Sequence, residues 1–353
     1  MTTRDLKRPL ARWRARLRSL GEQWATTKAE WEAERALERA IAGDGPLIVG
    51  PWISEVGYEV LYWIPFLRWV RAAYRIPPDR VVAMSRGGTA SWYRDIAARY
   101  VEVFDWIAPA DLAARAAAGE LKQREISALD RRLLDHASET LRLRNPAVLH
   151  PSLLFRWFSP FWSGHEGVGF VERHTRHARI VPPRETLPVS MPSDYVAVKF
   201  YGARALPDDP RVRGQVQSIV AALAERTSVV QLDTGVAFDE HADVSVSGTN
   251  GVIRLSGRLD PRTNLGVQTQ IISGARLFVG TCGSLAWLAP LLGIDTVPVL
   301  TDAAFLHAHL HVARRVYGRV GGGRFSPLDL SGIVDAGLLV GRDDRVAATV
   351  RVP

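Results

Sequence analysis

The chain has 353 residues, enough for two domains of ordinary size, and its 47% hydrophobic and 23% charged residues exclude intrinsic disorder and fibrous structures. A single cysteine excludes a disulfide framework and a cysteine-clustered metal site, and it indicates a reducing compartment. The net charge is +8, but residues 1–20 hold seven basic residues against one acidic, so the remaining 333 residues carry only +2. A nucleic-acid-binding domain would carry its basic footprint on the fold itself, so no nucleic-acid partner is expected.

The first segment, residues 1–42, is predicted to be an amphipathic helix. Apolar residues from Leu6 to Trp31 recur at spacings of three, four and seven, which is typical of a seam along one helix face. Arginines at positions 12, 14, 16 and 18 suit an anionic membrane surface, whereas the glutamates from position 30 onward do not. Two interpretations stay open: peripheral membrane contact, or packing of residues 1–40 on their own domain or on a second copy of the chain.

No export signal or membrane span is predicted. The basic start is not followed by a continuous apolar run, as a signal peptide would require. The longest uncharged stretch, residues 277–294, contains three glycines and a proline, so it is better described as a strand, a turn and a short buried helix. The expected location is cytoplasmic, or peripheral to the inner face of a membrane.

Alternating strand and helix patterns fill residues 43–190. Each predicted strand is a short apolar run that leads through a turn into a helical pattern, which implies parallel strands and crossover helices. The predicted strands are 47–50, 80–85 and 101–104, and the predicted helices are 58–74 and 91–100, followed by helical composition over 107–145. Residues 146–192, rich in proline, histidine and aromatic residues, are predicted to be an irregular hinge region.

A second α/β unit is predicted over residues 191–330, before a tail at 331–353. Its strands are expected at 195–200, 228–232, 252–255 and 277–279, and its helices at 212–225 and 264–273. The predicted fold class is therefore α/β, with two Rossmann-like domains facing a cleft and an N-terminal amphipathic helix.

The most informative motif is the turn Gly280-Thr281-Cys282-Gly283-Ser284. A buried strand ends there and a helix begins at once, so backbone N–H groups and the Thr281 and Ser284 hydroxyls are predicted to converge on an anion, most economically a diphosphate. The alternative interpretation is that the glycines only allow tight packing of the strand on the helix.

Other polar residues follow neighbouring strands of the same unit. Lys199, Tyr201 and Arg204 come just past the strand at 195–200, where cations would neutralise a departing diphosphate. Asp233 and Thr234 follow the strand at 228–232, where a ribose or base edge is commonly held. Arg204 is alternatively a solvated surface charge.

The loop after the first strand carries Glu55 and leads to Glu59. Glu55 is expected to face the cleft and to take a proton from an acceptor hydroxyl, whereas Glu59 is either a second catalytic carboxylate or a helix-start charge. His150 is an alternative base. The triplet at 307, 309 and 311 predicts no metal site, because alternate histidines share a face only in a strand and no carboxylate pair completes the set.

The Glu55-x-Gly57-x-Glu59 loop, together with Asn264, Gln268 and the glycine turn, resembles bacterial glycosyltransferases of the GT-B fold, including heptosyltransferases and fucosyltransferase-like enzymes. The resemblance implies a nucleotide-sugar donor on the second unit, a cell-surface glycan or lipid-linked acceptor on the first, and no cofactor or obligatory metal. It implies substrate-binding roles for Asn264 and Gln268. Two other hypotheses remain: a non-catalytic nucleotide- or glycan-binding protein of this architecture, and a sugar-nucleotide epimerase.

Overall fold

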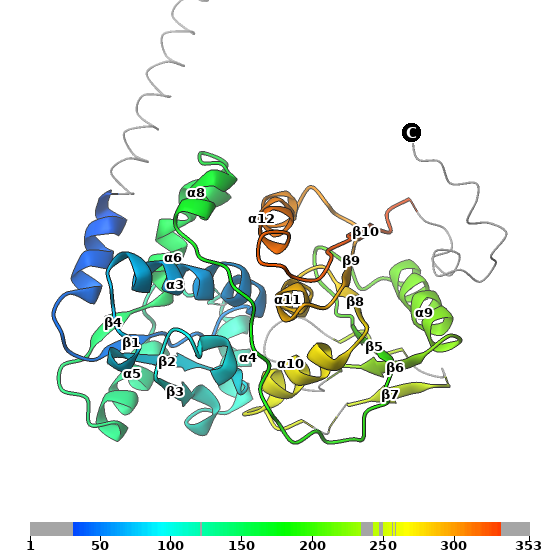
Figure 1. Cartoon of the computed structure of the whole chain (residues 1–353), viewed down its shortest axis with the longest axis horizontal. Coiled ribbons are helices and arrows are strands. Elements are labelled where there is room, and N and C mark those ends of the chain that lie inside the picture. Colours follow the sequence, from blue (N-terminus) through cyan, green and yellow to red (C-terminus); the bar gives the residue numbers. More distant parts are fainter. Residues whose placement is uncertain are drawn as a thin grey trace, which may run out of the picture.

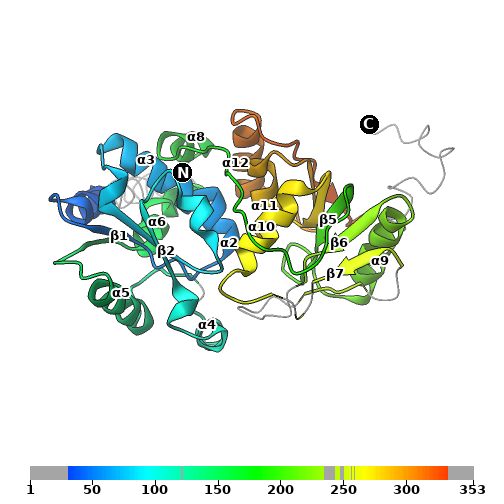
Figure 2. The same ribbon diagram turned by 60° about the horizontal axis from the view of Figure 1, so that its bottom comes forward.

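The structure is a computed structural model, and it describes residues 31–120, 122–233, 243–246, 250–255, 257 and 259–332. These residues form two β-sheets with helices around them (Figures 1 and 2). Every strand pair in both sheets is parallel. Parallel strands are covered on both faces, which explains why they appear in the sequence as short runs of consecutive apolar residues.

The first sheet has the order β3-β2-β1-β4. Its strands are β1 (Leu47–Val49), β2 (Val81–Ser85), β3 (Arg99–Glu102) and β4 (Ala147–Leu149). The main helices around it are α2 (Val56–Tyr58), α3 (Ile64–Ala73), α4 (Pro109–Ala117), α5 (Ala128–Thr140), α6 (Pro151–Trp157), α7 (Ser159–Trp162) and α8 (Val168–Arg173). A π-helical turn, Glu59–Trp63, joins α2 to α3, and short 3₁₀ turns lie at Pro78–Arg80, Thr89–Tyr93 and Val103–Asp105.

The second sheet has the order β10-β9-β8-β5-β6-β7. Its strands are β5 (Tyr195–Lys199), β6 (Ser228–Gln231), β7 (Val252–Arg254), β8 (Leu277–Thr281), β9 (Thr296–Leu300) and β10 (Leu328–Asp329). The helices are α9 (Pro210–Ala224), α10 (Asn264–Gly274), α11 (Ser284–Leu288) and α12 (His307–Tyr317), and a 3₁₀ turn at Ala289–Leu292 continues α11. The predicted α/β class, with two Rossmann-like halves, is confirmed. The predicted domain boundaries stay predictions.

Two predicted elements differ in the structure. The helix expected at 91–100 is wrong: a 3₁₀ turn over Thr89–Tyr93 is followed by β3, which begins at Arg99. Tyr100 and Val101 pair with Ala83 and Met84 of β2, so pairing across the sheet overrides the local helical pattern.

The predicted irregular region at 146–192 contains β4 and three short helices. Pro151 and Pro160 lie in the first turn of α6 and α7, where a missing N–H costs nothing, so these prolines begin helices rather than interrupt them. Residues 174–194 have no regular structure, and they lead from α8 to β5 across the face of the molecule (Figure 1).

A helix covers residues 31–41 and packs on the first half. Ala33, Leu37 and Ile41, spaced by four residues, are buried in the core, and Trp31 is exposed. The predicted seam from Leu6 to Trp24 lies outside the described residues, so the choice between membrane and chain contact stays a prediction. Among the residues that the structure describes, no helix is both long and apolar enough to span a bilayer.

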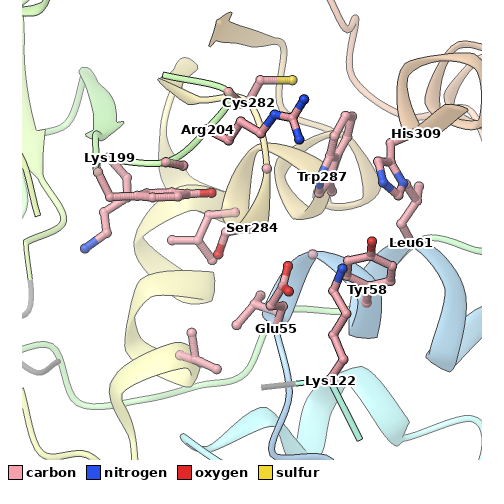
Figure 3. A pocket seen from close by; sticks show the side chains of 18 of the residues that line it. Glu55, Tyr58, Leu61, Lys122, Lys199, Arg204, Cys282, Ser284, Trp287 and His309 are labelled. Atoms are coloured by element: carbon pink, nitrogen blue, oxygen red, sulfur yellow. The ribbon is translucent and has the colours of Figure 1, made fainter. Parts of the chain in front are cut away.

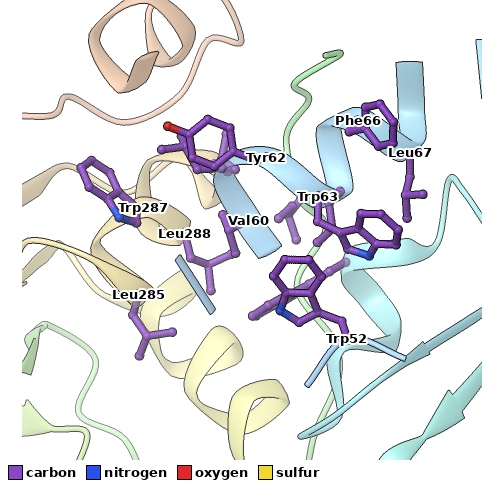
Figure 4. Packing of buried hydrophobic residues seen from close by; sticks show 14 of the residues in the cluster. Trp52, Val60, Tyr62, Trp63, Phe66, Leu67, Leu285, Trp287 and Leu288 are labelled. Atoms are coloured by element: carbon purple, nitrogen blue, oxygen red, sulfur yellow. The ribbon is translucent and has the colours of Figure 1, made fainter. Parts of the chain in front are cut away.

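One hydrophobic core joins the two halves. Side chains of the first half, including Val60 and Tyr62, belong to the same buried cluster as Leu285, Trp287 and Leu288 of the second half (Figure 4). Domains that meet through small polar surfaces usually move relative to one another, whereas a buried apolar interface opposes such motion. A continuous apolar core therefore joins the two halves.

Candidate functional site

A pocket of about 810 Å³ lies between the two halves, at the carboxyl ends of β1 and β5 (Figure 3). Each half contributes both charged and aromatic side chains. The predicted residues that line it are Glu55, Lys199, Tyr201, Arg204, Asn264, Gln268, Gly283 and Ser284. Residues on its wall that were not among the predicted site residues include Tyr58, Arg86, Lys122, Arg124, Trp287 and His309.

Glu55 lies on the first-half wall of the pocket. It is half-buried and occupies the N-cap position of α2, with extended backbone angles. Its carbonyl oxygen accepts hydrogen bonds from Trp52 Nε1 at 3.3 Å and from the Glu59 amide at 3.2 Å. In Figure 3 its carboxylate points toward the second half, near Ser284. The predicted cleft-facing position of Glu55 agrees with this geometry.

Of the glycine turn, only Cys282, Gly283 and Ser284 line the pocket. Gly283 and Ser284 line the pocket, and Ser284 has φ +35°, a strained value for a residue with a side chain. A Cβ on Gly283 would lie 2.5 Å from the Tyr201 hydroxyl, so a larger residue would displace the Tyr201 side chain. Gly283 thus allows Tyr201 to lie against the turn at the pocket.

The prediction that Gly280 and Thr281 contact an anion is wrong, because neither residue lines the pocket. A Cβ on Gly280 would lie 2.3 Å from the Lys199 carbonyl oxygen, so the glycine allows the close approach of β8 and β5. The Thr281 hydroxyl donates to the Tyr201 carbonyl at 3.0 Å and accepts from the Tyr201 amide at 2.9 Å. These two residues therefore join β8 to β5 and to Tyr201, which is neither the anion contact nor the packing of strand on helix that the sequence suggested.

Two cations reach the pocket from the second half. Lys199 Nζ donates to Asp243 Oδ1 at 2.5 Å. Arg204 is largely exposed, with its guanidinium 4.3 Å above the ring of Phe305 and its Nε 3.9 Å from Asp302. An exposed ion pair of this length contributes little, so Arg204 can turn toward an anion at small cost.

The polar pair Asn264 and Gln268 lies one helical turn apart on α10. Both residues line the pocket and are almost fully buried. Gln268 Nε2 donates to Asn264 Oδ1 at 2.5 Å, so the two amides hold each other in orientation. Such a pair offers hydrogen-bonding groups with fixed direction.

The predicted role of Asp233 in holding a ribose or base edge is wrong, because its side chain does not line the pocket. It is 1% exposed, and it accepts hydrogen bonds from Gln231 Nε2 at 2.5 Å and from the Ser245 hydroxyl. Burial raises the pKa of this carboxyl, and the bond from Ser245 and the charge of Lys199 oppose that rise. Asp233 therefore ties β6 to residues 243–246, and Thr234 lies outside the described residues.

The prediction of Glu59 as a second catalytic carboxylate is also wrong. Its carboxylate is fully buried behind the pocket wall, where it accepts from Ser85 Oγ at 2.6 Å, Tyr93 OH at 2.5 Å and Arg86 Nη1 at 3.2 Å. Burial raises its pKa, against the opposing charge of Arg86. A carboxylate with three internal partners has no access to a substrate proton, so Glu59 serves to hold Arg86.

His150 does not line the pocket either. Only 4% exposed, it caps α6 by accepting from the Ser152 amide at 3.1 Å, and its Nε2 lies 3.6 Å from Asp130 Oδ2. The predicted role of His150 as a base is therefore corrected to a structural one.

His309 is the histidine of the triplet that lines the pocket. Its Nδ1 lies 2.7 Å from the hydroxyl of Tyr62, which connects the two halves. Burial and the charge of Lys122 lower its pKa to about 4, so the ring is neutral at pH 7. His307 and His311 face each other one turn apart, and within the described ranges no group of three or more candidate ligands is placed to bind a metal ion.

Little in the sequence indicates that Lys122, Arg124 and Arg86 line a pocket. Lys122 and Arg124 occur in a polar stretch between two predicted helical regions, and nothing local indicates that this stretch reaches a cleft. Arg86 follows a predicted strand, which places it at the carboxyl edge of the sheet, and this position was the available signal.

No protein-family model matches the chain, and no curated protein sequence matches it. Among solved structures, the bacterial iron-containing dodecameric glycosyltransferase TibC from enterotoxigenic E. coli shares 13% identity over 72% of this chain, with a TM-score of 0.41. The chain spans less than two thirds of that protein, 58% of its length. The E. coli ADP-heptose lps heptosyltransferase II shares 12% identity over 73% of this chain and 85% of its own, with a TM-score of 0.41.

SnogD, a glycosyltransferase from Streptomyces nogalater, shares 15% identity over 81% of this chain and 87% of its own, with a TM-score of 0.36. The chain is thus similar to two glycosyltransferases and a heptosyltransferase of known structure.

Proposed function

We propose that this protein is a glycosyltransferase that moves a sugar from a nucleotide-diphosphate donor to a hydroxyl of a cell-surface glycan or lipid-linked acceptor. The observation that carries the proposal is the Glu55 carboxylate on one wall of a pocket that is otherwise rich in cations. The first half presents Glu55 beside the cations Arg86, Lys122 and Arg124, and the second half presents Lys199 and Arg204. This arrangement suits a reaction in which a proton is removed on one side and negative charge develops on the other.

The second half is proposed to bind the donor. Arg204 and Lys199 would stabilise the negative charge of the departing nucleoside diphosphate, and Asn264 with Gln268 would bond sugar or nucleotide hydroxyls. A volume of about 810 Å³ is large enough for such a donor. Cations of the chain itself supply the charge compensation in this scheme, without an obligatory metal or a cofactor.

The first half is proposed to bind the acceptor. The acceptor oxygen forms a bond to the anomeric carbon as its proton passes to Glu55, while the bond from that carbon to the diphosphate oxygen breaks and its electron pair leaves with the nucleotide. A base in this position is required if the configuration inverts. If the configuration is retained, Glu55 would orient the acceptor instead.

The experiment is a transfer assay over a panel of nucleotide sugars and acceptors with Glu55→Gln. Glu139→Gln, an exposed carboxylate of α5 outside the pocket, is the matched control. We expect Glu55→Gln to lose about 100-fold or more in kcat, within the range for a positioned acid–base group, and the control to match the unmodified protein. Nucleotide binding without transfer would favour a non-catalytic protein, and a changed sugar nucleotide in the absence of acceptor would favour an epimerase.

Residues 1–30 are proposed to bring the protein to an anionic membrane surface, from the cytoplasmic side, or to a second copy. Ala33, Leu37 and Ile41 belong to the core, so a deletion that tests this proposal should end at residue 30. Loss of binding to anionic vesicles after this deletion would support membrane contact. Unchanged vesicle binding would exclude it, and a smaller particle in solution would indicate contact between copies.

A further inference from the structure

The loop that carries Glu55 has no regular secondary structure, yet most of its backbone polar groups are hydrogen-bonded. It connects the end of β1 at Val49 to the start of α2 at Val56. Backbone groups in a buried loop need partners, and here side chains from other segments supply several of them. The Trp52 amide donates to the Met84 carbonyl at 2.8 Å, and the Arg86 guanidinium donates to the Ser54 carbonyl.

Further contacts come from Gln123, which lies between α4 and α5. Its side-chain oxygen accepts from the Ile53 amide at 2.9 Å, and its Nε2 donates to the Pro51 carbonyl at 2.8 Å. The residue is 0% exposed. One amide group thus makes two hydrogen bonds to the loop, two residues from Glu55.

A hydrogen bond to Asp130 fixes the orientation of the Gln123 amide. Gln123 Nε2 also donates to Asp130 Oδ1 at 2.9 Å, so the nitrogen must face the carboxylate and the oxygen must face the Ile53 amide. Asp130 is itself held by the Ser127 amide and hydroxyl at 2.8 and 2.7 Å. Although burial alone would raise its pKa, bonding to His150 and the charge of Arg115 lower that pKa to about 2, so the acceptor stays ionised.

The neighbours of Gln123 face the other way. Lys122 and Arg124 are exposed and line the pocket, while Gln123 points inward to the loop. Lys122 Nζ lies 5.2 Å from the ring of Tyr58, and Figure 3 shows it on the same side of the pocket as Glu55. Three consecutive residues therefore connect the cationic pocket wall to the loop of the proposed base.

We propose that Gln123 is a positioning residue, which holds the 50–55 loop so that the Glu55 carboxylate meets the acceptor hydroxyl. This inference rests on the proposed function for its catalytic consequence, but not for its geometry. A displacement of about 1 Å in a catalytic group can cost about 100-fold in rate. The hydrogen bonds from Gln123 to the 50–55 loop therefore have a measurable effect on turnover, because their loss would let Glu55 move.

The first test is the steady-state kinetics of Gln123→Met, which keeps the volume of the side chain and removes its hydrogen bonds. Gln215→Met is the control, because Gln215 is similarly buried, bonds the Leu330 carbonyl at 3.3 Å and lies outside the pocket. We expect kcat to fall about tenfold or more, the donor KM to change less than about twofold, and the acid limb of the kcat pH profile to shift. Unchanged kcat and pH profile in a folded Gln123→Met protein would overturn the proposal.

The second test uses the unmodified protein and needs no activity. The Ile53 amide is bonded to the Gln123 side chain, so residue-resolved hydrogen exchange should show it protected, and Gln123→Asn, one methylene shorter, should speed its exchange about tenfold or more. Rapid exchange of Ile53 in the unmodified protein would overturn the positioning role. An inactive protein with a protected Ile53 would instead contradict the proposed function and leave the role of Gln123 in holding the loop supported.

Discussion

Gly57 of the first half lies so close to Ser284 of the second half that a Cβ on Gly57 would be 3.2 Å from the Ser284 amide nitrogen. The same carbon would lie 3.1 Å from Cδ1 of Trp287. Trp287 is nearly fully buried and stacks on Phe325 with 5.3 Å between ring centroids, so it has little room to move. The absence of a side chain at position 57 therefore sets the spacing between the Glu55 loop and the strained turn at Ser284.

Gly57→Ala is expected to disturb the pocket more than the stability of the fold. Alanine is favoured over glycine in a helix by about 1 kcal/mol, which offsets the crowding, so the free energy of unfolding should stay within about 1 kcal/mol of the unmodified value. Affinity for a nucleoside diphosphate, measured by calorimetry, should fall by about fivefold or more as Ser284 shifts. Gly214→Ala in α9, where a Cβ meets open space, is the control and should leave affinity unchanged. Normal affinity in Gly57→Ala would contradict the importance of this contact.

The two halves should unfold together. Leu288 is fully buried in the core that both halves share, so Leu288→Ala should lower the free energy of unfolding by about 2–5 kcal/mol through lost burial and a cavity. Calorimetry should show one transition that moves as a whole to lower temperature. Ile126→Ala, at an exposed apolar residue, should change stability by no more than about 0.5 kcal/mol. Two separate transitions, with only one displaced, would show that the shared core does not couple the halves.

Stability should decline on mild acidification because of two histidines. Burial, together with the charge of Lys122 for His309 and of Arg68 for His177, lowers the pKa of each ring from 6.5 to about 4. Between pH 6.5 and about 4 the unfolded chain binds protons that these rings in the folded protein do not, so the free energy of unfolding falls as pH falls through that window.

The check is chemical denaturation at pH 7.0 and 4.5, with His309→Asn and His307→Asn compared. His307 is exposed on the same helix, so its variant should keep the full loss of stability. His309→Asn should reduce the loss by about 1 kcal/mol or more, since each pKa unit corresponds to about 1.4 kcal/mol and burial holds the pKa of this ring near 4. Equal losses in both variants would show that His309 is not the titrating group.

Arg204→Ala should weaken nucleoside diphosphate binding by about tenfold, because a charge-assisted hydrogen bond contributes about 1.5–3 kcal/mol where water is partly excluded. The affinity of the unmodified protein should also fall with added salt more steeply than that of the variant. Arg213→Ala removes an exposed arginine of the same half that pairs with Asp208 outside the pocket, and it should bind like the unmodified protein. Equal affinities of Arg204→Ala and Arg213→Ala would remove Arg204 from the site.

The amino-acid sequence by itself determined the two parallel α/β units and the place of Glu55 in a loop after the first strand. Runs such as Tyr195–Lys199 are short, apolar and followed by turn residues, and these are local properties that survive without knowledge of the partner strand. The glycine turn likewise predicted a helix that begins directly after a buried strand, as α11 does after β8, but not the positive φ at Ser284.

Only the tertiary structure decided which polar residues meet the pocket. Glu55 and Glu59 are four residues apart, yet one lines the pocket and the other is fully buried, because Ser85, Arg86 and Tyr93 enclose the Glu59 carboxylate. Tyr62 and His309 are 247 residues apart in sequence and share a hydrogen bond. A periodic pattern reports that one face of an element is buried, but the neighbour that buries it is set by how two sheets and their shared core come together in space.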